Sequence, residues 1–347
     1  MTVSIITGDC RERLRELPDD SVQCCVSSPP YFGLRDYGVD GQIGLEETPE
    51  AFVAELVAVF REVRRVLRPD GTLWLNLGDS YANDGKFGGA TGGKHSKWLH
   101  GGETRIGREK RRTGLKPKDL IGIPWRVAFA LQADGWYLRQ DIVWAKPNPM
   151  PESVTDRCTK AHEYLFLLSK TDRYFFDAKA IAEPVSGDPE SSRNRWDAKD
   201  YAVPGQKPQK RVSRSGNKAR KPGLARGCPN GTGQNVCGSV PWEGSTRNKR
   251  SVWSVATSPF PDAHFATFPP ALIEPCVLAG SRPGDTVLDP FGGAGTTGLV
   301  ADRLGRDAVL IELNPEYAAL TRRRIASDAG LFADITNHQS HQPETAE

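Results

Sequence analysis

A strand, a glycine-rich turn and a helix follow one another near the C-terminus, and this corner constrains the fold more than any other segment. The run Asp285-Thr-Val-Leu-Asp289 predicts a strand that ends in an acid. Gly293 and Gly295 predict a turn without side chains, and a helix is expected from about Thr296 to Leu304. Because missing side chains let a ligand approach the backbone, the corner predicts a nucleoside-binding site in an α/β fold.

Two ligand classes are open for this corner. Gly293, Gly295 and Gly298 match the dinucleotide pattern G-x-G-x-x-G, and Glu312 is placed to accept hydrogen bonds from ribose hydroxyls. Too little chain follows the corner, however, for the further strands of a nicotinamide dinucleotide fold. Asp289 favours a cationic ligand over a pyrophosphate, because a carboxylate attracts positive charge. The corner therefore favours S-adenosylmethionine, which carries an ammonium and a sulfonium.

A second motif, Ser28-Pro29-Pro30-Tyr31, lies at the end of an apolar run near the N-terminus. Two consecutive prolines fix two φ angles and remove two N–H donors, so the turn offers carbonyl acceptors and few donors. A hydroxyl precedes the turn and an aromatic ring follows it. These groups suit a planar molecule that bears an amino group, with acceptors for its hydrogens and a ring for stacking. A surface polyproline segment is the alternative, and the corner at Asp289 favours the binding site.

Strands and helices alternate along the chain, which predicts a mostly parallel sheet flanked by helices. Thr48 is expected to cap a helix that begins at Pro49, carries apolar residues at helical spacing up to Leu67, and ends before Pro69-Asp70-Gly71. The other expected helices are Cys10–Leu17, Pro124–Gln132 and Pro270–Ala279, and the expected strands are Val3–Ile6, Val22–Val26, Thr72–Leu77, Tyr137–Trp144, Glu163–Leu168 and Ala308–Ile311.

The two motifs together resemble one protein family. Ser28-Pro29-Pro30-Tyr31 early in the chain and Asp289-Pro-Phe-x-Gly-x-Gly-Thr-Thr297 late in it are similar to the β-class amino-group DNA methyltransferases. The resemblance covers roughly residues 1–180 and 255–325. It implies a Rossmann-like S-adenosylmethionine-dependent fold with a seven-stranded, mostly parallel sheet. It also implies a circular permutation that puts the catalytic half first, and an inserted basic recognition region.

The resemblance implies a role for each matching residue. The Ser28 hydroxyl and the Pro29 carbonyl, next to Pro30, would accept hydrogen bonds from the amino group of the target base, and Tyr31 would stack on that base after it leaves the duplex. Asp9 would accept from the adenine amino group of the cofactor, although it is equally placed to cap the following helix. The other cofactor-binding residues would be Thr267, Asp289, Phe291, Gly293, Gly295, Thr296, Thr297 and Glu312, and no metal is expected.

The first residue of the early motif bears on the target base. In this family a serine at this position is usually associated with cytosine N4, and an aspartate with adenine N6. Ser28 therefore favours a site-specific methyltransferase that transfers a methyl group from S-adenosyl-L-methionine to cytosine N4 in duplex DNA by base flipping. Adenine N6 stays open as the alternative, because both bases present an amino group to the turn.

Two segments carry a strong positive charge, although the formal net charge of the chain is only +3. Residues 86–118 contain ten Lys or Arg against two Asp or Glu, and residues 178–250 contain fifteen against six, so the rest of the chain is acidic. Such segregation is typical of a protein that binds a polyanion. Solvated loops are the alternative for these Gly-, Ser- and Pro-rich segments, and loops of this kind also order on DNA.

Domain boundaries follow from the motifs and the charge. We expect a catalytic half in residues 1–177 that includes the basic loop 86–118, and a target-recognition insertion in residues 178–250. A cofactor-binding half would follow in residues 251–325, and a flexible tail in residues 326–347. The sequence contains no apolar run of about 18 residues for a membrane span. Seven cysteines without a C-x-x-C pattern indicate reduced thiols in the cytoplasm.

Three classes of function are compatible with these patterns. The first is a DNA methyltransferase of a prokaryote or phage, acting on double-stranded DNA as a monomer or homodimer. In a restriction–modification system, a cognate restriction endonuclease would be its partner. The second is a nicotinamide-dependent oxidoreductase, and the third is a DNA-binding module with a vestigial cofactor site. Transfer of a labelled methyl group to DNA would separate the three classes.

Overall fold

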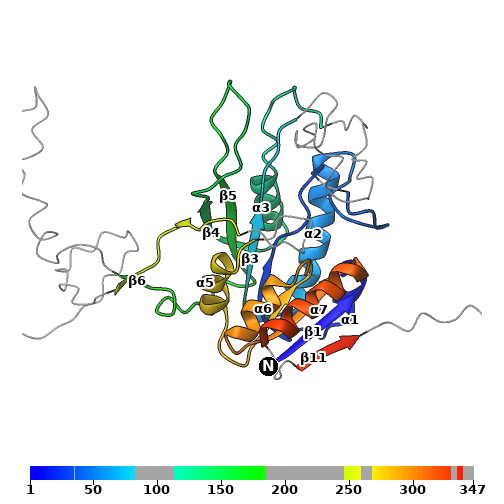
Figure 1. Cartoon of the computed structure of the whole chain (residues 1–347), viewed down its shortest axis with the longest axis vertical. Coiled ribbons are helices and arrows are strands. Elements are labelled where there is room, and N and C mark those ends of the chain that lie inside the picture. Colours follow the sequence, from blue (N-terminus) through cyan, green and yellow to red (C-terminus); the bar gives the residue numbers. More distant parts are fainter. Residues whose placement is uncertain (35, 83–112, 185–245, 259–267, 330–333, 339–347) are drawn as a thin grey trace, which may run out of the picture. The chain divides into compact units, whose positions relative to one another are not determined.

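The computed structural model describes residues 1–34, 36–82, 113–184, 246–258, 268–329 and 334–338 (Figure 1). The chain divides into two units, one of Met1–Ile181 with Lys249–Glu347 and one of Ala182–Asn248. In the smaller unit, β6 (Glu183–Pro184) pairs antiparallel with β7 (Thr246–Arg247). Most of the two basic segments and Thr267 lie outside the described residues, so the predictions made for them are not tested by the structure.

A nine-stranded sheet forms the centre of the larger unit. The strand order is β11-β1-β10-β9-β2-β3-β5-β4-β8. Strand β5 is antiparallel to its neighbours β3 and β4, and all the other neighbouring pairs of this sheet are parallel. The strands are β1 (Thr2–Thr7), β2 (Val22–Ser27), β3 (Leu67–Leu77), β4 (Tyr137–Ala145), β5 (His162–Ser169), β8 (Val252–Ser254), β9 (Thr286–Asp289), β10 (Asp307–Glu312) and β11 (Asp334–His338). The predicted α/β class with a mostly parallel sheet is confirmed.

The sheet has two more strands than the seven expected, and both lie at its edges. Strand β8 is only three residues long, which is too short to show an alternating pattern in the sequence. Strand β11 has the polar sequence Asp-Ile-Thr-Asn-His and pairs in parallel with β1, where a flexible tail was expected from residue 326. Such an edge strand pairs through its backbone, so it does not require an apolar run that could be recognised in the sequence. The circular permutation implied by the family resemblance stays a prediction.

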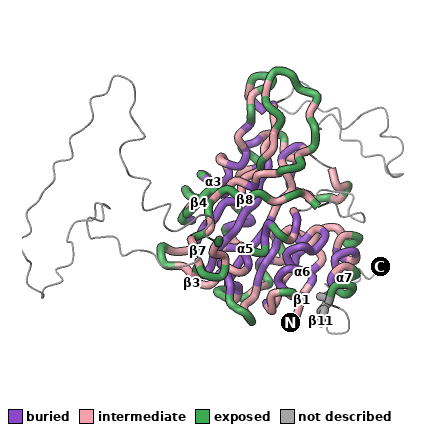
Figure 2. Tube along the Cα trace, turned by 60° about the vertical axis from the view of Figure 1, so that its left-hand side comes forward, coloured by how far each residue is buried: buried purple, intermediate pink, exposed green. Residues whose placement is uncertain are grey.

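The described helices form two layers, one on each face of the sheet (Figure 1). Helices α1 (Cys10–Glu16), α2 (Pro49–Val66) and α3 (Ile123–Ala133) contribute to one hydrophobic cluster. Helices α5 (Pro270–Gly280), α6 (Thr296–Arg303) and α7 (Pro315–Ala329) contribute to the other. Figure 2 shows the buried residues along the strands and on the inner sides of the helices, and the exposed residues mainly in the loops.

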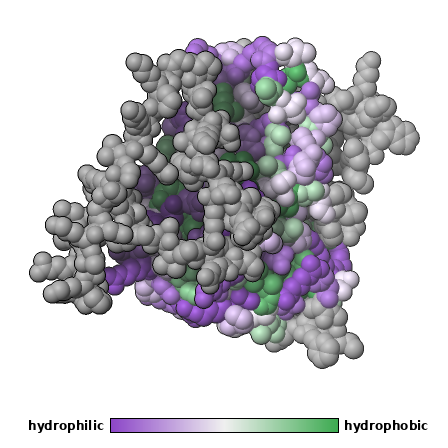
Figure 3. All heavy atoms as spheres, turned by 90° about the vertical axis from the view of Figure 1, so that its left-hand side faces the viewer, coloured by the Kyte–Doolittle hydropathy of each residue, from purple (hydrophilic) through white to green (hydrophobic). Residues whose placement is uncertain are grey.

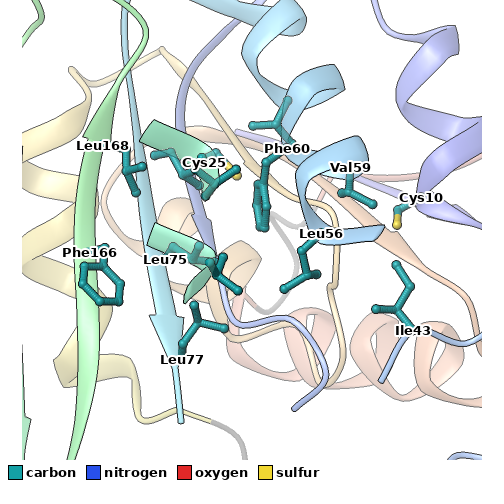
Figure 4. Packing of buried hydrophobic residues seen from close by; sticks show 14 of the residues in the cluster. Cys10, Cys25, Ile43, Leu56, Val59, Phe60, Leu75, Leu77, Phe166 and Leu168 are labelled. Atoms are coloured by element: carbon teal, nitrogen blue, oxygen red, sulfur yellow. The ribbon is translucent and has the colours of Figure 1, made fainter. Parts of the chain in front are cut away.

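Helix α2 illustrates how the apolar pattern specifies packing. Thr48 caps the helix as predicted, since its hydroxyl accepts from Ala51 N at 3.1 Å. Its apolar stripe is fully buried and meets the side chains of β2 and β3, as Figure 4 shows for Leu56 and Phe60 beside Leu75. Truncating such a residue, for example by Leu56→Ala, is expected to cost about 2–5 kcal/mol of unfolding free energy.

The junction between α2 and β3 differs from the prediction. A turn was expected at Pro69-Asp70-Gly71, but β3 already begins at Leu67, directly after the helix. The register shows how the strand can begin at Leu67 and still contain the Pro69-Asp70-Gly71 segment: Val22 pairs with Leu67, whereas Cys24 pairs with Thr72. Residues 68–71 therefore form an irregularity within the strand pairing, and regular pairing resumes at the apolar run that was predicted as a strand.

The described surface is of mixed character. On the face shown in Figure 3, hydrophilic and hydrophobic side chains of the described residues alternate over short distances. Within the described ranges, no helix combines the length and the apolar composition that crossing a bilayer requires. The same residues contain no group of three or more His, Cys, Asp or Glu side chains arranged to hold a metal ion.

Candidate active site

Strands β2 and β9 lie side by side at the point where the chain turns toward opposite edges of the sheet. From β2 the chain continues through α2 to β3 on one side, and from β9 it continues through α6 to β10 on the other. The two strands are parallel, with Cys25 opposite Leu288. In open α/β sheets, ligands bind outside the carboxyl ends of the strands at such a switch point. Ser28 directly follows β2 and the glycine turn directly follows β9, so both sequence motifs lie there.

The backbone of the glycine turn forms the corner predicted from the sequence. Gly293 and Gly295 have φ angles of +51° and +75°, in the left-handed region that favours glycine. A Cβ on Gly295 would lie 2.4 Å from Thr321 Cγ2, so α7 also packs too closely for a side chain there. The N–H of Gly293 donates to Glu312 Oε2 at 2.7 Å, which links the turn to the end of β10. The conformation of this turn therefore depends on its glycines.

Glu312 and Asp9 come together at the ends of neighbouring strands. Thr7 of β1 pairs with Glu312 of β10, and Gly8 N donates to Glu312 O at 2.9 Å. Asp9, the next residue, therefore lies beside the end of β10. Asp9 caps α1, because Arg11 N donates to its Oδ1 at 2.8 Å. Burial raises the pKa of Asp9, but the hydrogen bonds from Arg11 outweigh it and leave the pKa below 3.8. The capping alternative is confirmed, and a contact of Asp9 with adenine stays a prediction.

The corner has room and acceptors for a ribose. Among the described residues, a Cβ on Gly293 would meet only the Phe291 carbonyl oxygen within 4 Å, at 3.8 Å, so this part of the turn is open. The Glu312 carboxylate oxygens accept from the backbone N–H groups of Gly293 and Asn314, with Leu313 N–H also nearby, and they keep further lone pairs. Burial raises the pKa of Glu312, partly offset by these hydrogen bonds. These features fit a ligand that brings hydroxyl donors to the open side of the turn.

Asp289 is engaged with the protein on both carboxylate oxygens. Its Oδ1 accepts from Ser27 Oγ at 2.6 Å and from Phe291 N at 3.0 Å, and its Oδ2 accepts from Thr297 Oγ1 at 2.7 Å. The side chain is buried, and this burial raises the pKa of Asp289 to about 6. The sequence predicted that Asp289 attracts a cationic ligand, whereas in the structure its hydrogen bonds join three elements of the protein.

The remaining predicted residues of the corner have defined partners. The Phe291 ring lies 6.4 Å from the Phe60 ring, centroid to centroid. The Thr296 hydroxyl accepts from Arg324 at 3.0 Å and is almost fully buried. The Thr297 hydroxyl is buried as well and lies within the Asp289 network. Their side chains thus build the corner, and any contact they make with a cofactor stays a prediction.

In the Ser28–Tyr31 turn, both hydroxyls are directed at residues of the neighbouring strands. Ser28 Oγ lies 3.3 Å from Asn76 Oδ1, at the end of β3, and donates to it. The Asn76 amide is held in turn, because its Nδ2 donates to Tyr164 O at 3.1 Å. Tyr31 OH donates to Glu163 Oε2 of β5 at 2.7 Å and lies 3.3 Å from Asn76 Oδ1. Since the carboxylate is closer and charged, it accepts the hydrogen bond from the Tyr31 hydroxyl. Asn76 Oδ1 then accepts the hydrogen bond from Ser28.

The Tyr31 ring is held on one side by backbone. A Cβ on Gly78 would lie only 2.4 Å from Tyr31 Cε2, so the ring packs directly on this glycine. Burial and the adjacent Glu163 carboxylate raise the pKa of the Tyr31 phenol well above 10. Glu163 also forms an ion pair with Lys146, whose ammonium lies 4.2 Å from the centre of the Trp144 ring. The phenol is therefore neutral near pH 7 and its ring has a defined orientation.

Several residues of this site were missed by sequence reasoning: Ser27, Asn76, Gly78, Lys146 and Glu163. A signal existed for Asn76, which is a polar residue in the otherwise apolar strand Thr72–Leu77. Glu163 was noted only as the start of a strand, and nothing local links it to Tyr31. Asp79, for which the sequence suggested no role, accepts from the N–H groups of Gly122 and Ile123 at 3.0 Å each and so caps α3. Thr267 lies in a segment that the structure does not describe.

Comparisons with known proteins agree with this geometry. Type II methyltransferase M.SmaI of Serratia marcescens is 45% identical over 321 residues, which cover 92% of this chain and 90% of that protein. Type II methyltransferase M.Cfr9I of Citrobacter freundii is 44% identical over 325 residues, which cover 94% and 88%. An identity of this level over nearly the whole length indicates common ancestry of the entire chain, not of one motif alone.

Solved structures share the fold. The cytosine-N4-specific PvuII DNA methyltransferase superposes with a TM-score of 0.58 at 18% identity, covering 93% of this chain and 87% of its own. The Thermus thermophilus protein TTHA0409, crystallised with S-adenosyl-L-methionine, gives a TM-score of 0.55 at 24% identity, covering 97% and 100%. The match to the family described as DNA methylase spans residues 22–323 and includes both motifs, which leaves the oxidoreductase alternative without support. The chain therefore belongs to the N6_N4_Mtase family of DNA methylases.

Proposed function

We propose that this DNA methyltransferase transfers a methyl group from S-adenosyl-L-methionine to the N4 amino group of cytosine in duplex DNA. The observation that carries the proposal is the convergence of the Ser28–Tyr31 turn and the glycine corner at the ends of the adjacent strands β2 and β9. A methyl donor in the corner and an amino group in the turn would lie next to each other. Bringing the two reactants together in the right orientation supplies much of the rate in such a displacement.

On the target side, the chain provides acceptors for the amino hydrogens. An exocyclic amino nitrogen is a poor nucleophile because its lone pair is delocalised into the ring. Ser28 Oγ donates its own proton to Asn76, so its lone pairs are available for an N–H of the base. With the Pro29 carbonyl as a second acceptor, the N–H bonds are drawn away from the ring and the lone pair localises.

The reaction transfers one methyl group and releases one proton. When bound, S-adenosyl-L-methionine supplies an electrophilic methyl group on its sulfonium. The amino nitrogen forms a bond to that carbon while the carbon–sulfur bond breaks, and the nitrogen then loses one proton. Once methylated, the nitrogen is strongly acidic, so the weakly basic Ser28 hydroxyl or a water molecule suffices as acceptor. No strong base is required in the turn, which is consistent with a neutral serine and a neutral amide there.

Tyr31 is proposed to receive the extruded base. One side of its ring packs on Gly78, and its hydroxyl is held by Glu163, which fixes the plane on which a base would stack. Stacking on an aromatic ring is worth about 1–3 kcal/mol per base. Such a contact offsets part of the unpairing and unstacking cost of base flipping.

On the donor side, Glu312 is proposed to accept from the ribose hydroxyls and Asp9 from the adenine amino group. Both lie at the ends of the paired strands β1 and β10, and Glu312 has free lone pairs beside the open part of the turn at Gly293. Phe291, Gly293, Gly295 and Thr296 are proposed to line the rest of this site, and Thr267 to hold the methionine carboxylate.

The choice of cytosine over adenine rests on Ser28, because serine at this position is usually associated with cytosine N4 in the family. Incubation with labelled S-adenosyl-L-methionine and duplex DNA, followed by nucleoside analysis, tests the proposal. We expect N4-methylcytosine. A product of N6-methyladenine would overturn the base assignment, and a chain that binds the donor but labels no DNA of diverse sequence would overturn the activity.

Variants of the turn test the placement of the target site. Ser28→Ala is expected to lower methyl transfer by about 100-fold or more, by analogy with the loss of one preorganised hydrogen-bond partner. Tyr31→Ala removes the stacking ring and should lower transfer by about 10- to 100-fold. Both should retain donor affinity, measured by calorimetry. Loss of donor binding in both variants would place Ser28 and Tyr31 in the wrong site.

We also propose that the enzyme is the modification component of a Type II restriction–modification system with a cognate endonuclease. Relatives named Type II methyltransferases match more than nine tenths of the chain. Protection of methylated DNA from an endonuclease of the same recognition sequence would test this role, and the basic segments are the proposed DNA-binding regions.

A further inference from the structure

Strands β2 and β9 separate at their carboxyl ends, and side chains continue the connection between them. The backbone pairing of the two strands ends at Cys25 and Leu288. Beyond that pair, Ser27 Oγ donates to Asp289 Oδ1 at 2.6 Å. Ser27 is adjacent to Ser28, and Asp289 precedes the glycine turn. This hydrogen bond therefore joins the two turns at the position where the sheet no longer does so.

A second hydroxyl ties the same carboxylate to the helix behind the turn. Thr297 Oγ1 lies 2.7 Å from Asp289 Oδ2 and 3.2 Å from the carbonyl oxygen of Val26 in β2. Ser27 and Thr297 are both fully buried, and Asp289 is 1% exposed. With Phe291 N on Oδ1, the carboxylate holds three donors, from β2, from the turn and from α6. Charged hydrogen bonds in a buried site are short, strong and directional.

From this geometry we infer that Ser27, Asp289 and Thr297 form a positioning unit, which sets the spacing and angle between the target turn and the cofactor turn. The inference rests on the proposed function of the two turns. It differs from the sequence-based expectation that Asp289 attracts the cationic donor directly. A displacement reaction depends steeply on the alignment of its reacting atoms, so loosening this unit should affect transfer within the assembled complex more than binding of either substrate.

The Thr297→Val variant removes the hydroxyl and keeps the side-chain volume. We expect its single-turnover rate of methyl transfer, with donor and DNA saturating, to fall by about tenfold or more, because misalignment of a fraction of an ångström has large effects on such a step. Dissociation constants for S-adenosyl-L-methionine and for DNA should change by less than about threefold. Thr297→Ser keeps the hydroxyl and should retain the rate. Ser27→Ala should resemble Thr297→Val, and the double variant should lose less than the product of the two losses.

A matched control separates positioning from stability. Thr72→Val on β3 also removes a fully buried hydroxyl, which hydrogen-bonds with Cys24 and Trp74 and, among the described residues, with none of either turn. It should retain the single-turnover rate even if its unfolding free energy falls as far as that of Thr297→Val. An equal rate loss in Thr72→Val, or a rate loss in Thr297→Ser as large as in Thr297→Val, would overturn the inference.

The Asp289→Asn variant addresses the competing assignment. An asparagine keeps an acceptor for Ser27 and Phe291 N and presents an amide to Thr297, which can accept from it, so the unit retains its shape. We expect donor affinity to change by less than about threefold and the rate of transfer to fall less than in Thr297→Val. A loss of donor affinity beyond tenfold in Asp289→Asn, with unchanged transfer in Ser27→Ala, would assign the carboxylate to the donor instead. A protein that methylates no DNA in its original form would contradict the proposed function, not this inference.

Discussion

The cofactor corner and the target turn lie at the ends of neighbouring strands, but different forces hold them. The corner is shaped by its own backbone, with Gly293 and Gly295 in left-handed conformations and the Gly293 N–H on Glu312. The target turn is held by side chains from β3 and β5, with Ser28 on Asn76 and Tyr31 on Glu163. A site held by backbone should fail when a side chain is added to it. A site held by distant side chains should fail gradually as each partner is removed.

The largest effect is expected for Gly295→Ala in the corner. A residue with φ near +75° costs about 1–2 kcal/mol, and forcing a methyl group against Thr321 costs about 1–3 kcal/mol more. Urea denaturation should therefore show a loss of about 2–5 kcal/mol, accompanied by loss of donor binding. Gly284→Ala is the control, because Gly284 has φ +81° but no atom of the described residues lies within 4 Å of the position that its methyl group would take. It should lose only the conformational part, and equal losses in the two variants would contradict the close packing.

A second prediction concerns the pH dependence of stability. Burial raises the pKa of Asp289 to about 6 in the folded chain, above its ordinary value of 3.8. The folded state therefore binds this proton more tightly than the unfolded state does. Stability from this group is fully present below about pH 4, falls as the pH rises toward 6, and is constant above that. At about 1.4 kcal/mol per pKa unit, the decrease amounts to about 3 kcal/mol.

The measurement for this prediction is urea denaturation between pH 4 and pH 8, on the original chain and on Asp289→Asn. Other carboxyl groups titrate in both proteins, so the difference between the two curves isolates Asp289. We expect the asparagine variant to lack the part of the decrease that lies between pH 4 and 6. Parallel curves over that range would mean that the decrease of the unfolding free energy between pH 4 and 6 does not come from Asp289.

In the target turn, Gly78→Ala should affect the reaction more than the fold. The added methyl group would lie 2.4 Å from the Tyr31 ring, which must therefore tilt or shift. We expect kcat to fall by about 10- to 100-fold, because the plane for the extruded base moves, while donor affinity is retained. In a Tyr31→Ala background the same substitution should have no further effect on kcat, since no ring is left to displace. A further loss there would show that Gly78 acts through another contact.

The smallest effect is expected for the partner of the Tyr31 hydroxyl. Glu163→Leu removes the acceptor and should lower kcat by about tenfold, or about 1.4 kcal/mol, because the ring loses its anchor but keeps its packing on Gly78. Tyr31→Phe should behave similarly, and the double variant should be no worse than either single one. Glu163→Gln keeps an acceptor for the phenol and should lose less. Additive losses would indicate that Glu163 acts independently of Tyr31.

The two regions also differ in how far the sequence predicted them. The corner was predicted correctly as strand, turn and helix, because its glycines and β-branched residues are local signals whose meaning does not depend on the rest of the chain. The partners of the target turn were not predicted. Asn76 and Glu163 lie 48 and 135 residues beyond Ser28 in the sequence, and only the pairing of β2 with β3 and of β3 with β5 brings them to it.

Helix α7 (Pro315–Ala329), two strands of the sheet and one role were missed, and the predicted tail from residue 326 overlaps the end of that helix. Strands β8 and β11 pair through their backbones at the sheet edges, and β8 also buries Trp253, but three to five residues are too few to show a strand pattern in the sequence. Asp289 was identified as important, but its partners could not be known. A carboxylate after a strand attracts a cationic ligand if it is exposed, and joins protein donors if it is buried. Burial is a property of the assembled fold.

By itself, the sequence determined the α/β class, the two motifs and the family to which they belong, because each depends on residues that are close together in the chain. Tertiary structure decided how the motifs meet. The sheet order places β2 beside β9, and the hydrogen bond from Ser27 to Asp289 joins residues that are 262 positions apart. Hydrogen bonds between buried side chains depend on distance and direction in space, and a linear pattern of residues contains neither.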